Sequence, residues 1–136
     1  MADIIKKSAF VIVLALLLLG CGAFDKQLYL YVPGRIDEAD VTGIDPVPVS
    51  VTGSVTVAYP VLSTLSIQLS VSDNGKERIA LDTGGPVIDE LGVTATFTVT
   101  TILDTNDTNT VTATITASAA GYTSDSVKIT IVSNVP

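Results

Sequence analysis

Apolar and polar residues alternate with a period of two along most of this chain from residue 49 onward. Odd positions carry Val, Leu, Ile, Ala or Phe, with Gly53 and Tyr59 as exceptions, and the even positions between them carry mostly Thr or Ser. The alternating segments are residues 49–59, 65–72, 93–100, 110–119 and 126–132. Because successive side chains of a strand point to opposite faces, this pattern predicts strands with one buried and one solvated face.

Turn residues separate the alternating segments. Asn74-Gly75 follows residues 65–72 and precedes a short additional strand expected at residues 78–81, and Asn-Gly between two strands is typical of a β-hairpin. Residues 105–109 are the next expected hairpin loop, which would place the threonine rows on either side of it on the same side of one hairpin. Six or seven short strands separated by turns predict a β-sandwich.

Residues 113–132, ATITASAAGYTSDSVKITIV, resemble the last two strands of bacterial immunoglobulin-like domains, in which a T-A-x-A-x-G-Y strand end leads through a turn into a final alternating strand. The resemblance implies an all-β fold, an immunoglobulin-like antiparallel β-sandwich of about seven strands, over residues 48–136. Tyr122 would then be a core or corner residue of the sandwich.

Residues 1–20 have the composition of a secretory signal peptide, which is expected to be helical. Lys6 and Lys7 precede an unbroken apolar run over residues 10–19, and small residues follow it. The uncharged stretch, residues 8–24, is shorter than the roughly 20 residues of a membrane-spanning helix. The alternative is an uncleaved anchor, including a pilin-like helix that packs inside a filament.

Leu18-Leu19-Gly20-Cys21 resembles the lipobox of bacterial lipoproteins. The resemblance implies export, attachment of a diacylglycerol to the Cys21 thiol, and cleavage before Cys21, so that acyl chains on Cys21 hold the protein at a membrane. Two or more chains anchor stably, whereas one anchors only marginally. Gly22 stands where Asp favours retention at the inner membrane, so the resemblance implies the outer membrane or the cell surface.

Residues 21–47 are expected to be an anchor and linker that contains one short strand. In residues 27–32, QLYLYV, the side chains of Leu28, Leu30 and Val32 share one face, and Tyr29 and Tyr31 share the other. Residues 33–48 hold several prolines, glycines and acids, which favour a loop over a central strand.

The charge and composition exclude several classes of function. The chain has 14 acidic and 7 basic residues, and its net charge of −7 argues against nucleic acid as a partner, which requires a basic surface. Histidine is absent, so the commonest general base and metal ligand is missing. The single cysteine, Cys21, permits no internal disulfide. No cofactor is expected.

Asp82-Thr83-Gly84 follows two apolar residues and resembles the active-site loop of aspartic proteases, in which two such loops share a proton between their carboxylates. Gly85 stands where that family has Ser or Ala, and no second supporting element follows. A turn between sandwich strands explains these residues equally well, so we expect the protein not to be an enzyme.

Two other features offer binding chemistry. Asp104, Asn106 and Asp107 supply oxygen ligands in one loop and are candidates for calcium, although the loop lacks EF-hand spacing, and a polar loop tip needs no metal. The threonine rows would suit ice, a glycan or another subunit, but threonine is also simply a favourable exposed strand residue.

The sequence therefore predicts a lipid-anchored protein of the cell envelope with a structural or adhesion-type binding role. Its partner would be a protein, a glycan or a further copy of the chain. The alternative is a subunit of an extracellular filament or pilus, assembled by strand addition or by packing of N-terminal helices.

Overall fold

The computed structural model describes residues 26–72, 75, 77–82, 85–103 and 109–134, and every regular element in these ranges is a strand. The strands in chain order are β1 (Tyr29–Tyr31), β2 (Arg35–Asp37), β3 (Ala39–Asp40), β4 (Val47–Pro48), β5 (Ser50–Thr56), β6 (Leu65–Ser66), β7 (Gln68–Val71), β8 (Ile79–Leu81), β9 (Val87–Ile88), β10 (Thr94–Thr101), β11 (Val111–Ser118) and β12 (Asp125–Val132). The predicted all-β class is confirmed.

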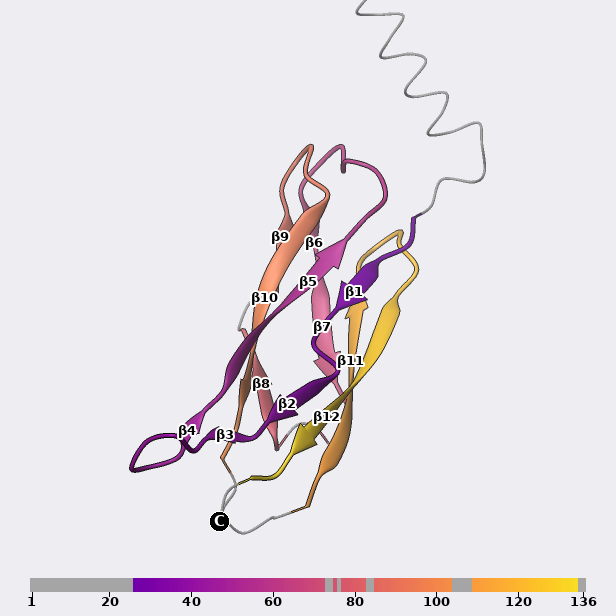
Figure 1. Ribbon diagram of the computed structural model, residues 1–136. Coiled ribbons are helices and arrows are strands. Elements are labelled where there is room, and N and C mark those ends of the chain that lie inside the picture. Colours follow the sequence, from indigo (N-terminus) through magenta and orange to yellow (C-terminus); the bar gives the residue numbers. More distant parts are fainter. Residues whose placement is uncertain (1–25, 73–74, 76, 83–84, 104–108, 135–136) are drawn as a thin grey trace, which may run out of the picture.

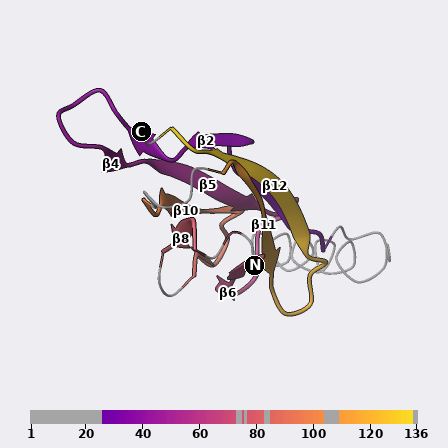
Figure 2. The same cartoon turned by 90° about the horizontal axis from the view of Figure 1, so that it is seen from below.

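Two four-stranded sheets face each other and make the predicted β-sandwich (Figure 1). One has the order β1-β5-β10-β8 and the other β2-β12-β11-β7, which is the immunoglobulin arrangement with its first strand divided between the sheets. Figure 2, seen along the strands, shows β5 and β10 on one side and β11 and β12 on the other. All pairs within these two sheets are antiparallel except β2 with β12, which is parallel.

The core lies between the sheets and consists mainly of the odd-numbered apolar residues of the long strands, joined by even-numbered residues from β1, β2, β9 and the segments beside them. In β10 and β11 the buried residues alternate with exposed or half-buried threonines, as the sequence predicts. Residues with no measurable exposure come from both sheets: Leu28, Val55, Ile88, Val99, Ala113, Ile115, Ala117, Ile129 and Ile131. Tyr122 packs against this core and is half-buried. Because the chain has no disulfide to restrict its unfolded state, burial of this apolar surface is the main source of stability.

Gly53 is the one interior position of β5 without an apolar side chain, and its register explains why. It lies opposite Phe97 of β10, whose ring covers it. A Cβ atom built on Gly53 would approach the ring to 2.4 Å. The glycine therefore makes room for the large aromatic side chain of the core.

Two connections that the sequence predicts as hairpins join different sheets instead. β7 pairs with β11 while β8 pairs with β10, and β10 pairs with β5 while β11 pairs with β12. Each of these strands takes a partner that is distant in the sequence. As a result the threonine rows of β10 and β11 lie on opposite outer faces of the sandwich, not on the same side of one hairpin.

Residues 27–47, which fall within the predicted anchor and linker (residues 21–47), belong to the sandwich. The expected strand at residues 27–32 forms as β1, with Leu28, Leu30 and Val32 buried and Tyr29 and Tyr31 exposed. The chain then crosses at Pro33 to the other sheet, forms β2, and turns back through the β3–β4 pair. The prolines lie at the crossing and on short edge strands, where a missing amide donor is tolerated.

The predicted helical signal segment, residues 1–20, and the predicted lipid attachment site at Cys21 lie outside the described residues. Within the described ranges there is no helix long and apolar enough to span a membrane.

Candidate functional site

The exposed aromatic side chains of β1 mark one outer face of the sandwich. Tyr29 is 47% exposed and Tyr31 is 63% exposed, while Leu30 between them is buried. The pleat of β1 thus directs both rings outward from the β1-β5-β10-β8 sheet. β1 is the edge strand of that sheet, so the rings border the rest of its outer surface.

Rows of hydroxyl groups continue this surface across β5 and β10. The register places Tyr29 beside Thr56, with Thr94 on the next strand beyond, and Tyr31 beside Ser54, with Thr96 on the next strand beyond. The hydroxyls of Thr56 and Thr94 are hydrogen bonded to each other at 2.6 Å, and those of Ser50 and Thr100 at 2.9 Å. We call this surface the tyrosine–hydroxyl face; it comprises Tyr29, Tyr31, Ser50, Thr52, Ser54, Thr56, Thr94, Thr96, Thr98 and Thr100. None of these ten residues is charged, although the chain is acidic.

The opposite outer face provides an internal comparison. β11 and β12 also present hydroxyls there, and those of Thr116 and Ser126 are hydrogen bonded at 2.7 Å. Lys128 lies two residues after Ser126 on the same outward side of β12, opposite Thr114. The outward positions of β7, β11 and β12 hold no aromatic residue. The two faces therefore share threonine rows, but only the first combines them with exposed aromatic rings.

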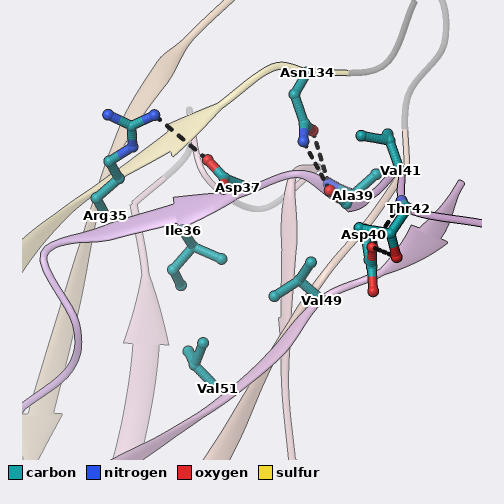
Figure 3. Close-up of a pocket in the computed structure, with 10 residues that line it drawn as sticks. All are labelled: Arg35, Ile36, Asp37, Ala39, Asp40, Val41, Thr42, Val49, Val51 and Asn134. Carbon is teal, nitrogen blue, oxygen red and sulfur yellow. Dashed lines mark hydrogen bonds and ion pairs between the residues drawn. The ribbon is translucent and has the colours of Figure 1, made fainter.

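A groove of about 390 Å³ opens between β2–β3 and β5, near the β3–β4 pair (Figure 3). Ile36, Val49 and Val51 form its apolar floor, and Figure 3 shows their side chains below the strand that carries Arg35 and Asp37. These two charged residues form an exposed ion pair at 3.6 Å. The groove thus combines an apolar floor with a charged rim, although it is shallow and open.

Two polar interactions fix the far side of this groove. The side-chain amide of Asn134 accepts a hydrogen bond from the backbone amide of Ala39 at 3.0 Å and donates one to its carbonyl at 2.8 Å, in the way of a neighbouring strand. The Thr42 hydroxyl and backbone amide both donate to the Asp40 carboxylate, at 2.7 and 2.9 Å. The hydroxyl first, and the amide second, lower the pKa of Asp40 below its ordinary value by stabilising the charged form.

The groove also borders an open strand edge. β1 pairs with β5 only from Ser54 to Thr56, so among the described residues no strand pairs with the preceding part of β5 on that side. In an antiparallel ladder, alternate residues bond to opposite sides. Thr101 donates to the Val49 carbonyl, so the odd residues of β5 face β10. The backbone groups of Ser50 and Thr52 therefore point to the open edge.

A buried ion pair lies between the sheets at the same end of the sandwich as the groove. Glu38 is fully buried and Arg78 is 2% exposed, and a guanidinium nitrogen lies 3.3 Å from a carboxylate oxygen. Arg78 also donates to the carbonyl of Asn109 at 3.0 Å. The Thr101 hydroxyl donates to the Glu38 carbonyl at 2.5 Å and accepts from the Val49 amide at 2.8 Å. These contacts join both sheets, which makes the pair structural.

The candidate residues from the sequence have different outcomes. Asp82 follows β8, and its carboxylate accepts a hydrogen bond from the Thr98 amide at 2.9 Å, so it extends the edge of the sheet. Cys21 and the calcium candidates Asp104, Asn106 and Asp107 lie outside the described residues. Among the residues that are described, no three Asp, Glu, Cys or His side chains gather as metal ligands. Sequence alternation indicated the outward direction of Tyr29 and Tyr31, but their hydroxyl neighbours required the register.

Comparison with known proteins supports the fold and does not identify a family. No protein-family model matches the chain, and no curated protein matches it. Among solved structures, it is similar to one from Bacteroides ovatus described as a "putative carbohydrate binding protein", with a TM-score of 0.52 and 9% sequence identity. The match covers 76% of this chain but only 36% of the other, so this chain spans about a third of that protein's length.

Proposed function

We propose that this chain is a lipid-anchored domain of the cell envelope that binds a neutral glycan on its tyrosine–hydroxyl face. The observation that carries the proposal is the register that sets the exposed rings of Tyr29 and Tyr31 beside uncharged hydroxyl rows. The fold likeness to a protein described as binding carbohydrate is consistent with this role.

The chemistry of a sugar ring suits such a surface. A pyranose presents C–H groups on its faces, which pack against an aromatic ring, and hydroxyls around its rim, which exchange hydrogen bonds with Ser and Thr. The spacing of strands, about 4.8 Å, repeats hydroxyls across the sheet at a distance comparable to the size of one sugar unit. The uncharged face on an acidic chain favours a neutral polysaccharide over an anionic one.

A binding assay with insoluble neutral polysaccharides tests the site. The protein is mixed with cellulose, xylan, starch or chitin, and the fraction retained is measured. We expect retention on at least one of them, with an affinity reduced roughly 5- to 30-fold by Tyr31→Ala or Tyr29→Ala, because loss of one stacked ring removes roughly 1–2 kcal/mol.

The matched control is Tyr59→Ala, which removes a tyrosine of similar exposure, 49%, from a loop outside this face. It should leave retention unchanged. Equal retention of the wild type and both β1 variants, or no retention on any of the polysaccharides, would refute the glycan site.

The anchor is tested separately by the mass of the intact protein extracted from membranes. We expect loss of residues 1–20 and addition of acyl chains to Cys21, because stable anchoring requires at least two chains. An unmodified Met1 or an unmodified Cys21 thiol in that sample would refute the anchor without affecting the glycan site.

The open edge of β5 favours a second candidate, self-assembly by strand addition. An added strand would bond the outward backbone groups of Ser50 and Thr52 and place its side chains over the apolar floor of the groove. Assembly predicts polymers by negative-stain microscopy that Thr52→Pro abolishes, since proline removes an amide donor on the open side alone.

A further inference from the structure

Exposed apolar side chains gather at the end of the sandwich opposite the groove. Four residues from the loops before β6 and before β10 make this surface, which we call the apolar tip: Tyr59, Leu62, Leu91 and Val93. Leu62 is 63% exposed and Leu91 is 70% exposed. In Figure 1 these two loops are at the top and extend beyond the beginning of β1. Large apolar side chains that gather in this way on a solvent-exposed surface indicate an interaction site.

Backbone hydrogen bonds hold the two loops of the apolar tip together. Val57 donates to the Val93 carbonyl at 2.8 Å, Val61 to the Gly92 carbonyl at 3.0 Å, and Leu91 to the Val61 carbonyl at 2.8 Å. Leu62 follows Val61 directly, so the last bond brings the segments of Leu62 and Leu91 together. The tip is therefore a fixed part of the sandwich, and its side chains are presented outward without an ordering cost for the loops.

The backbone at Leu91 points to a role for its side chain outside folding. Leu91 has a φ of 66°, and within the described residues it is the only non-glycine residue with a positive φ. That conformation costs a leucine of the order of 1 kcal/mol relative to glycine or asparagine. Because the side chain is mostly exposed, burial in the folded domain does not offset this cost. An apolar partner outside the domain would.

The described chain enters the sandwich at the same end as the apolar tip. Tyr29 at the start of β1 pairs with Thr56, the last residue of β5 before the first tip loop. Five residue steps separate Cys21 from Lys26, the first described residue, and they span at most about 18 Å. An acyl chain on Cys21 therefore holds this end of the sandwich near the membrane. A longer polypeptide linker between Cys21 and the sandwich would not hold it there.

We propose that the apolar tip inserts into the surface of the membrane beside the acyl chains, so that the sandwich stands with its strands away from the lipid. This inference rests on the proposed lipid anchor at Cys21. Asp89 and Glu90 directly precede Leu91 and are exposed, so the membrane surface that fits is one with neutral headgroups. The tyrosine–hydroxyl face then lies along the side of the upright domain and is open to a glycan.

The absence of tryptophan from the chain gives a direct test, because one introduced tryptophan is the sole such fluorophore. Leu62→Trp places it in the apolar tip. Ile44→Trp, in the loop between β3 and β4 at the far end, is the matched control, since Ile44 is also an exposed apolar residue. Both variants are made in the full chain, extracted in acylated form, and reconstituted into phosphatidylcholine vesicles with and without brominated acyl chains.

We expect the Leu62→Trp fluorescence to shift to shorter wavelength and to be quenched by the brominated lipid, and the Ile44→Trp fluorescence to do neither. Adding Leu91→Asn to Leu62→Trp should lower the docked population about tenfold, because one leucine leaves the lipid. Asparagine accepts a positive φ, so this variant keeps its fold.

Equal quenching of the two tryptophan variants would overturn the inference, and so would the absence of quenching in both. The mass of the same samples separates the two proposals. Acylated protein without quenching at the tip refutes only the docking, whereas protein without acyl mass refutes the anchor and the docking that rests on it.

Discussion

Removal of Arg78 from the buried ion pair is the perturbation with the largest expected effect on this fold. Arg78→Met keeps much of the volume of the side chain but leaves the carboxylate of Glu38, which has no exposure, without its cation. Charges 3.3 Å apart attract each other by about 5 kcal/mol at an effective dielectric constant of 20. Loss of one partner of a buried pair typically costs about 3–5 kcal/mol.

The expected loss is a large fraction of the stability of a domain of this size, which is of the order of 5–15 kcal/mol. The double variant Glu38→Leu with Arg78→Met removes both charges and should recover most of the loss, because an apolar pair avoids the cost of desolvation. The carbonyl of Asn109, which also accepts from Arg78, belongs to an exposed residue and can bond to water instead.

Urea denaturation followed by circular dichroism measures these differences. Arg35→Met is the control, because it breaks the exposed pair with Asp37, whose side chains are 70% and 54% exposed, and should cost less than about 1 kcal/mol. A loss of unfolding free energy in Arg78→Met no larger than in the control would contradict the role of the buried pair. A double variant less stable than Arg78→Met alone would contradict it too.

Three further predictions concern individual contacts. Thr42→Ala should raise the pKa of Asp40 toward its ordinary value, because it removes the hydroxyl donor and leaves the amide, and NMR titration of the carboxyl carbon measures this change. In the wild type the lowered pKa stabilises the fold at pH values above the ordinary pKa of Asp, and this contribution is lost as the pH falls through the pKa of the folded state. Gly53→Ala should cost about 1–3 kcal/mol in a urea titration, because its methyl group meets the ring of Phe97. Thr101→Val should cost about 1–3 kcal/mol in the same assay, because it removes a buried hydroxyl that bonds two backbone groups, and no loss would contradict the proposed role.

The strand periodicity could be predicted from the sequence because each strand has only one buried face. Alternation placed Leu28, Leu30 and the core residues of β10 and β11 correctly, and it placed Tyr29 and Tyr31 outward. Partner choice could not be predicted in this way. A turn looks the same in sequence whether it joins neighbours in one sheet or crosses between sheets, so the sequence predicts hairpins where the β7–β8 and β10–β11 connections join different sheets.

For a different reason, the sequence does not predict that residues 33–48 belong to the sandwich. Their prolines, glycines and acids are typical of a linker, yet Ile36 and Ala39 are buried and Glu38 is neutralised by Arg78, which is distant in the sequence. Only the folded partner reveals that such an acid belongs to the interior. The same limit applies to the candidate site, because alternation predicts the outward direction of each aromatic and hydroxyl residue separately, and only the strand register shows that they are neighbours.

The binding site itself is tested most directly by NMR titration of the isotope-labelled protein with a soluble oligosaccharide of the polysaccharide that it retains. If the glycan binds this site, the chemical shifts change only on the tyrosine–hydroxyl face, most strongly at Tyr29, Tyr31 and Thr56, and those of the hydroxyl rows of β11 and β12 stay unchanged. Shift changes centred on Thr116 and Ser126 of the opposite face, or none at the two tyrosines, would contradict it.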